Sequence, residues 1–142
     1  MAYATQQQLI DRYGAQMVID LSDRQAPPAN VIDAVVVARA IADTTALIDG
    51  YLATRYTLPL TAVPDLVTDL ALQIAIYKLH AQTVGDKVRA DYEAAVRLLR
   101  EIAAGALRIP AGGLEPAVSG AQGVQTNDRE RPFTSENLKG FI

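Results

Sequence analysis

The sequence contains no cysteine and only one histidine. Without cysteine, the chain forms no disulfide, no thiolate metal site and no cysteine nucleophile. General base catalysis and zinc ligation usually recruit histidine with a positioned partner, and no partner is identifiable for His80. His80 lies near the end of a predicted helix, where an imidazole often bonds to the last carbonyls. We therefore expect a structural role for His80.

Motifs of the common enzyme classes are also missing. There is no G-x-S-x-G nucleophile elbow, no phosphate-binding loop and no dinucleotide-binding fingerprint. Asp20, Asp23 and Asp33 surround a loop, but SDRQAPPANVID lacks the internal glycine and closing glutamate of a calcium loop. We predict that the protein is not an enzyme and uses no metal or cofactor. The enzyme interpretation would require a catalytic triad in which the fold brings together His80, a carboxylate and a serine.

Clustered positive charge is absent as well. The thirteen Lys and Arg residues are scattered among sixteen Asp and Glu residues, and the net charge is −3. Autonomous DNA binding needs clustered basic residues, so we do not expect it. The longest apolar stretch, residues 70–79, contains Gln73 and Lys78 and is too short to span a bilayer. The first residues lack the basic and apolar regions of a signal peptide, so we expect none.

The sequence shows helical periodicity along much of its length, and half of its residues are hydrophobic. Thr5 and Gln8 have the spacing of a capping box before a short helix that ends at Gly14. Residues 15–21 predict another turn or two of helix. Prolines in residues 22–30 predict a loop.

A long helix is predicted over residues 31–56. Asn30 is expected to cap it, with Asp33 in the first turn, where a carboxylate complements the helix dipole. One stripe of this helix is mainly apolar and is expected to face the core. It consists of Val37, Ile41, Thr44, Ile48, Tyr51 and Leu52.

Two more helices follow. Pro64 suits the first turn of a helix that runs to about residue 81. This helix is apolar nearly all round, which indicates that it lies at the centre of the bundle. Asp86 is expected to cap the last helix, and Gly105 to end it. The fold class is therefore all-α, a small bundle of four to five helices. We expect its core to join these side chains: Leu70, Ile74, Tyr77, Ile41, Ile48 and Leu99.

One face of the long predicted helix carries small residues. They are Ala42, Ala46, Gly50 and Ala53, flanked by Arg39 and Asp49. Glycine inside a helix costs about 1 kcal/mol relative to alanine, and close packing against another helix would offset that cost. We interpret this face as an inter-subunit interface. The alternative is that Gly50 marks a harmless kink.

The character of the chain changes after Gly105. We divide it into a helical domain, residues 1–105, and a long extended arm, residues 106–142, which is rich in glycine and proline. The end of the arm concentrates charge and aromatic anchors that suit binding hot spots. These are Arg129, Arg131, Phe133, Leu138 and Phe141. We expect both phenylalanines to insert into apolar pockets of a partner; the alternative is a disordered tail.

Several segments in order resemble the small Mu-like prophage protein family. They are YATQQQLIDRYG, LSDR followed by VIDAVVVARAIADTTALIDGYLATRYTLPL, VPDLVTDLALQIAIYKLH, DYEAAVRLLREIAAG, and ENLKGF after RPF. The most specific piece is IDGYLATRYTLPL with the downstream VP. Residues 25–30, QAPPAN, depart from the Asp/Gly-rich turn common in the family, which puts any ion-binding role of that loop in doubt.

The resembled family is similar to head–tail connector (neck adaptor) proteins of tailed bacteriophages. The resemblance implies a virion structural protein that forms a homo-oligomeric ring of about twelve subunits by head-to-tail contacts. Its implied partners are the portal protein, a tail terminator or other neck proteins, and passing DNA that it does not bind sequence-specifically. Its implied location is the virion neck, after assembly in the host bacterial cytoplasm. The alternatives are another neck component, such as a tail terminator or stopper, and a small helical protein-binding or regulatory module.

Overall fold

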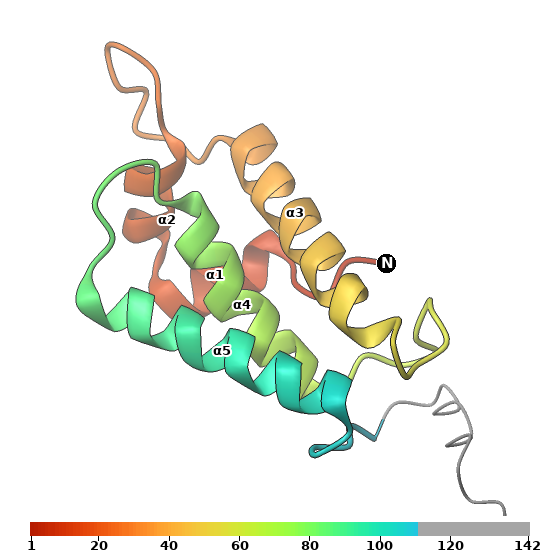
Figure 1. Ribbon diagram of the computed structural model, residues 1–142. Coiled ribbons are helices and arrows are strands. Elements are labelled where there is room, and N and C mark those ends of the chain that lie inside the picture. The colour runs from red at the N-terminus through yellow and green to blue at the C-terminus, as the bar shows by residue number, and fades with distance from the viewer. Residues whose placement is uncertain (111–142) are drawn as a thin grey trace, which may run out of the picture.

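The computed structural model describes residues 1–110, and most of them lie in five helices (Figure 1). The helices are α1 (Gln6–Tyr13), α2 (Ala15–Ser22), α3 (Ala34–Leu52), α4 (Asp65–Leu79) and α5 (Asp86–Ala104). No strand occurs among residues 1–110. The predicted all-α class is therefore confirmed.

The first helix begins and ends where its local sequence predicts. The Thr5 hydroxyl accepts the main-chain N–H of Gln8 at 3.3 Å, and the Gln8 side chain accepts the N–H of Thr5 at 2.9 Å. This reciprocal pair is a capping box. Gly14 has a φ of 85°, a conformation that glycine adopts without steric cost, and α2 begins directly after it.

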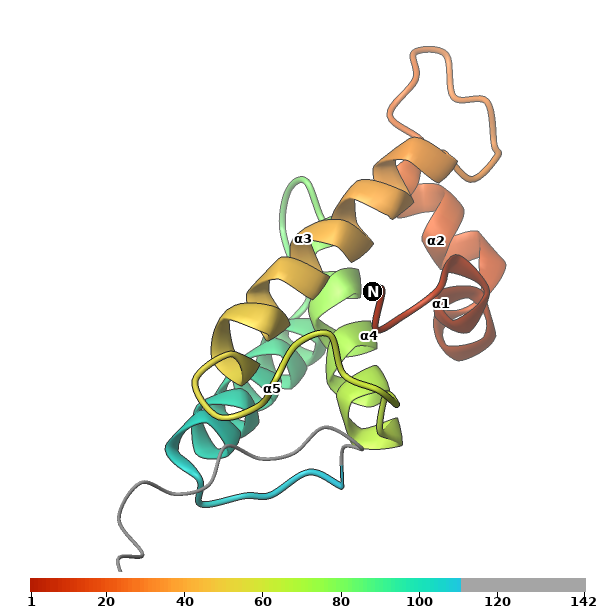
Figure 2. The ribbon, with the colours of Figure 1, turned by 90° about the vertical axis from the view of Figure 1, so that its right-hand side faces the viewer.

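The start of α3 corrects the prediction that Asn30 caps this helix. The cap is Asp33, whose carboxylate accepts the N–H groups of Val35 at 2.9 Å and Val36 at 3.2 Å. The N–H of Asp33 in turn donates to the buried Ser22 hydroxyl at 3.1 Å. Asn30 lies in the loop, which projects from one end of the bundle (Figures 1 and 2). Side-chain contacts from α2 therefore set the first residue of α3.

The end of α3 also differs from the predicted range of residues 31–56. The helix stops at Leu52 because the chain then turns: the N–H groups of Arg55 and Tyr56 both donate to the Leu52 carbonyl, at 2.9 and 2.8 Å. Tyr56, outside the helix, is buried against the core. Tyr56 follows Leu52 at helical spacing, so periodicity alone does not mark where α3 ends.

The central position predicted for α4 is confirmed. Its buried residues fall on several sides of the helix. The helix packs against α3 and α5 (Figures 1 and 2). Those buried residues are Val67, Leu70, Ala71, Leu72, Ile74, Ala75, Ile76 and Leu79. The helix ends at Leu79, two residues before the predicted end, because His80 is extended. Leu70, Ile74, Ile41, Ile48 and Leu99 are all buried in one core, whereas Tyr77 is half-buried.

The last helix, α5, ends as predicted but begins differently. Its N-cap is Gly85, not Asp86, and Asp86 is instead the first helical residue. There the Asp86 carboxylate still complements the helix dipole. Gly105 ends α5 with a φ of 80°. On the inner side of α5, Tyr92 stacks on Tyr77 of α4 with ring centroids 3.9 Å apart.

The chain stays packed against the bundle beyond α5. Ile109 is 6% exposed, and its N–H donates to the Tyr56 hydroxyl at 3.2 Å. The first residues of the predicted arm therefore contribute to the core. The division into a helical domain and an arm remains a prediction, since residues 111–142 lie outside the described part of the chain.

Candidate functional site

The small-residue face of α3 points away from the core. Ala42, Ala46, Gly50 and Ala53 are all exposed, while Ile48 on the opposite side is fully buried. A Cβ built at Gly50 would meet nothing within 4 Å. Within residues 1–110, no helix packs onto Gly50, so its lack of a side chain serves no contact inside this part of the chain.

The two charged residues that flank this face differ. Arg39 is exposed, whereas Asp49 is half-buried and accepts a hydrogen bond from the Tyr3 hydroxyl. Burial, followed by the bond to Asp49, raises the pKa of the Tyr3 hydroxyl above its ordinary value. Asp49 therefore holds the N-terminal segment on α3, a role that the sequence did not indicate. Its proposed part in an interface remains a prediction.

An apolar groove runs along the edge of the small-residue face. It lies between the N-terminal segment and α3 and has a volume of about 370 Å³. Ala2 and Ala4 form one wall, and Ala38, Ile41 and Ala42 form the other. Through Ala42, the groove joins the small-residue face, so a helix that packs on α3 would also reach the N-terminal segment.

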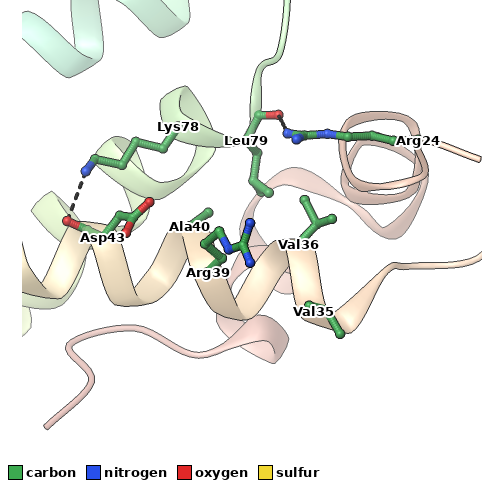
Figure 3. A pocket seen from close by; sticks show the side chains of 8 residues that line it. All are labelled: Arg24, Val35, Val36, Arg39, Ala40, Asp43, Lys78 and Leu79. Carbon is green, nitrogen blue, oxygen red and sulfur yellow. Dashed lines mark hydrogen bonds between the residues drawn. The ribbon is translucent and has the colours of Figure 1, made fainter.

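A charged cleft of about 240 Å³ lies where α3 begins and α4 ends (Figure 3). Arg24, Arg39 and Lys78 supply three cations to it, and Asp43 supplies one carboxylate. Arg24 donates to the Leu79 carbonyl at 3.3 Å, and Lys78 donates to the Asp43 carbonyl at 2.9 Å. Both bonds use main-chain oxygens, so neither cation is neutralised by a carboxylate.

No pattern in the sequence predicts this cleft. Arg24 and Leu79 are 55 residues apart, and Lys78 and Asp43 are 35 apart. No local motif brings them together, because their proximity depends on how α3 and α4 pack. The signal available in the sequence was Lys78, a charged residue after the apolar run that ends α4.

The isolated ionisable residues have structural roles. The Nδ1 atom of His80 lies 2.8 Å from the carbonyl oxygen of Ile76, which accepts the hydrogen bond, as expected for an imidazole at the end of a helix. Asp23 accepts the N–H groups of Gln25 at 3.2 Å and Asn30 at 2.7 Å, and so shapes the loop. Among residues 1–110, no group of three His, Asp or Glu residues is placed to hold a metal ion.

The five anchors predicted in the arm are outside the described residues. They are Arg129, Arg131, Phe133, Leu138 and Phe141. Within residues 1–110, no helix is long and apolar enough to cross a membrane.

Comparison with known proteins shows which protein family has these helices. Residues 3–127 match a family described as bacteriophage Mu, Gp36. The chain belongs to the bacteriophage Mu Gp36 family. It is 31% identical over 140 residues to "Mu-like prophage FluMu protein gp36" of Haemophilus influenzae, which covers 99% of this chain and 98% of that protein. It is also 31% identical over 142 residues to "Gene product J" of Escherichia phage Mu, covering both chains completely.

This result confirms the resemblance to Mu-like prophage proteins. The Gp36 match includes all five helices and every residue of the charged cleft and of the small-residue face. The described bundle is therefore the fold of a bacteriophage protein family. The family names state no activity, ligand or position in the phage particle.

Proposed function

We propose that this Gp36-family chain is a structural, non-enzymatic protein of the virion neck: a head–tail connector that forms a ring between the portal and the tail. The supporting observation is the exposed small-residue face of α3. Along this face, Ala42, Ala46 and Gly50 leave the backbone open to close approach, and nothing in residues 1–110 covers Gly50. A ring subunit needs such a surface for a neighbour.

The charge of the chain suits a ring that surrounds DNA. Its net charge is −3, and the charged cleft gathers only three of its thirteen basic residues. Tight binding to phosphates requires several Lys or Arg residues in one place. A mildly acidic ring lets DNA pass through the channel without adhering to the wall.

Loss of the protein in its own phage tests this proposal. A nonsense mutation in the gene should yield filled heads and free tails that remain unjoined, and supply of the wild-type chain from a plasmid should restore joining. An enzyme or regulatory protein would leave complete particles or stop their production at an earlier step. Joined, infective particles formed without the protein would overturn the proposal.

A map of the neck in wild-type particles then gives the position of the ring. A connector contacts the portal directly, whereas a tail terminator or stopper is separated from the portal by another ring. Density for five helices per subunit in the ring next to the portal is the expected result. Density elsewhere in the neck would favour the terminator or stopper assignment.

A further inference from the structure

The charged cleft combines an apolar floor with a cationic rim. Val35, which is 70% exposed, and the half-buried Val36 form the floor together with the buried Ala40 and Leu79, whereas Arg24 and Arg39 are exposed at the rim (Figure 3). A cleft of this kind suits a peptide segment that places an aliphatic side chain on the floor and a carboxylate at the rim.

The positive charge of the cleft is available to a partner. Arg24 and Lys78 are held in place by bonds to main-chain carbonyls, and the Arg39 guanidinium has no hydrogen-bond partner within residues 1–110. The Asp43 carboxylate offsets one of the three cations, which leaves an excess of two positive charges. Arg24 and Lys78 are therefore pre-organised for an anion, because they lose little side-chain freedom on binding, and Arg39 is free to pair with it.

The rest of the chain carries a net negative charge. Without these four residues, thirteen basic and sixteen acidic side chains become ten basic and fifteen acidic ones. A second copy of the same chain is therefore a partner of complementary charge. Such a partner would present an exposed carboxylate beside apolar side chains that are partly open to solvent.

Asp65 meets this requirement at the opposite end of α4. It is exposed, and no hydrogen bond or ion pair engages its carboxylate among the described residues. Val63, Pro64 and Leu66 lie beside it and line the same hollow, with Pro110. Because α4 has 15 residues, Asp65 and Leu79 are about 20 Å apart, so Asp65 does not reach the cleft of its own chain.

We propose that Asp65 of one copy docks into the charged cleft of the next copy. Its carboxylate pairs with Arg39 at the rim, between Arg24 and Lys78, and Val63 and Leu66 cover the apolar floor. The contact joins two different surfaces, so it is heterologous and repeats from copy to copy, as a closed ring requires. This inference rests on the proposed ring and names one contact within it.

A charge swap in the full-length chain tests the pairing. Arg39→Glu and Asp65→Arg should each weaken self-association at least about tenfold in sedimentation velocity, and the two together should restore it to within about threefold. Arg97→Glu, the same charge change on an exposed position of α5, is the matched control and should have no effect. Unchanged far-UV circular dichroism excludes misfolding. Single variants that associate normally, or a double variant that is not restored, would overturn the proposed contact.

Disulfide trapping tests the same contact in assembled particles without changing a charge. The chain has no cysteine, so Val36→Cys in the cleft and Ala62→Cys beside Asp65 introduce the only thiols. Oxidation should produce a ladder of covalent multimers from the double variant, because each copy then bridges to two neighbours. Each single variant should give no ladder. Monomers alone from the double variant would overturn the contact.

These experiments separate the contact from the proposed function. A ladder and a charge-swap rescue in a protein that lies outside the neck would support the contact and reject the connector function. A neck ring whose variants give neither a ladder nor a charge-swap rescue would support the connector function and reject the contact. If the cleft instead binds DNA phosphates, Arg39→Glu should weaken binding of a short DNA duplex while Asp65→Arg leaves self-association unchanged, and that pattern would also overturn the contact.

Discussion

The main-chain N–H of Ile109 donates to the Tyr56 hydroxyl at 3.2 Å, across 53 residues of sequence. Both residues are buried, so the bond ties the segment after α5 to the turn after α3 inside the core. It fixes the place where residue 110 leaves the bundle. The same end of the molecule carries Asp65 and Pro64, since Pro110 lines a hollow with them.

Removal of the Tyr56 hydroxyl should lower the free energy of unfolding, because the bond to Ile109 is lost. Tyr56→Phe leaves the Ile109 N–H buried without an acceptor, which costs about 1–3 kcal/mol. Tyr51→Phe, at a half-buried tyrosine whose hydroxyl has no hydrogen bond among the described residues, is the control and should change the stability little. Urea unfolding measures both variants. Equal stabilities would mean that water replaces the Tyr56 hydroxyl at Ile109.

Truncation of the α4 core should cost far more than truncation at a partly exposed site. Leu70 is 0% exposed at the centre of the bundle, so Leu70→Ala should lower the free energy of unfolding by about 2–5 kcal/mol. Leu98→Ala, the same change at a half-buried position of α5, should cost clearly less. A thermal melt compares them. If Leu70→Ala melts like the wild type, Leu70 is not a core residue.

The small-residue face gives opposite expectations for stability and assembly. Gly50→Ala should stabilise the monomer by up to about 1 kcal/mol, because helix propensity improves and the added methyl meets nothing. Ala46→Leu or Gly50→Leu should leave the helix content intact but block joining of heads and tails, because the larger side chain holds the neighbouring helix away. Circular dichroism and plaque counts measure the two effects. Normal assembly of both leucine variants would exclude close contact at this face.

The Tyr3 hydroxyl provides a pH test. Because the pKa of Tyr3 is raised in the folded chain, its contribution to stability is complete below the unfolded pKa of about 10 and is lost as pH rises above that value. Tyr3→Phe removes both the bond to Asp49 and this titration. The stability difference between wild type and variant should therefore shrink in urea titrations above about pH 10. A difference independent of pH would argue against the raised pKa.

The predicted anchors of the arm are testable by truncation. Deletion of residues 128–142 removes Phe133 and Phe141, and we expect the helical bundle to remain folded while head–tail joining weakens, because a tethered aromatic anchor is lost. A double variant with both phenylalanines changed to alanine separates the aromatic side chains from chain length. Truncated particles that mature and infect normally would make the arm a passive tail.

Local chemistry in the sequence predicted some helix ends and missed others. Thr5, Gly14 and Gly105 were predicted because each signal acts within a few residues: a capping box and two glycines with positive φ. The predicted start of α3 was wrong because Asp33, which caps the helix, is positioned by a bond to Ser22, eleven residues earlier. The charged cleft was missed for the same reason at longer range. Periodicity identifies which face of a helix is buried, but not which charges two packed helices bring together.

The stacked pair Tyr77 and Tyr92 is an intrinsic spectroscopic probe of tertiary packing. The chain has no tryptophan, so its near-ultraviolet signal comes from its tyrosines and two phenylalanines. The two rings lie 3.9 Å apart, one on α4 and one on α5, so their asymmetric environment persists only while these helices are docked. Near-ultraviolet circular dichroism disappears when tertiary packing loosens, even where helices persist. The docking of α5 on α4 can therefore be followed during assembly without an attached dye.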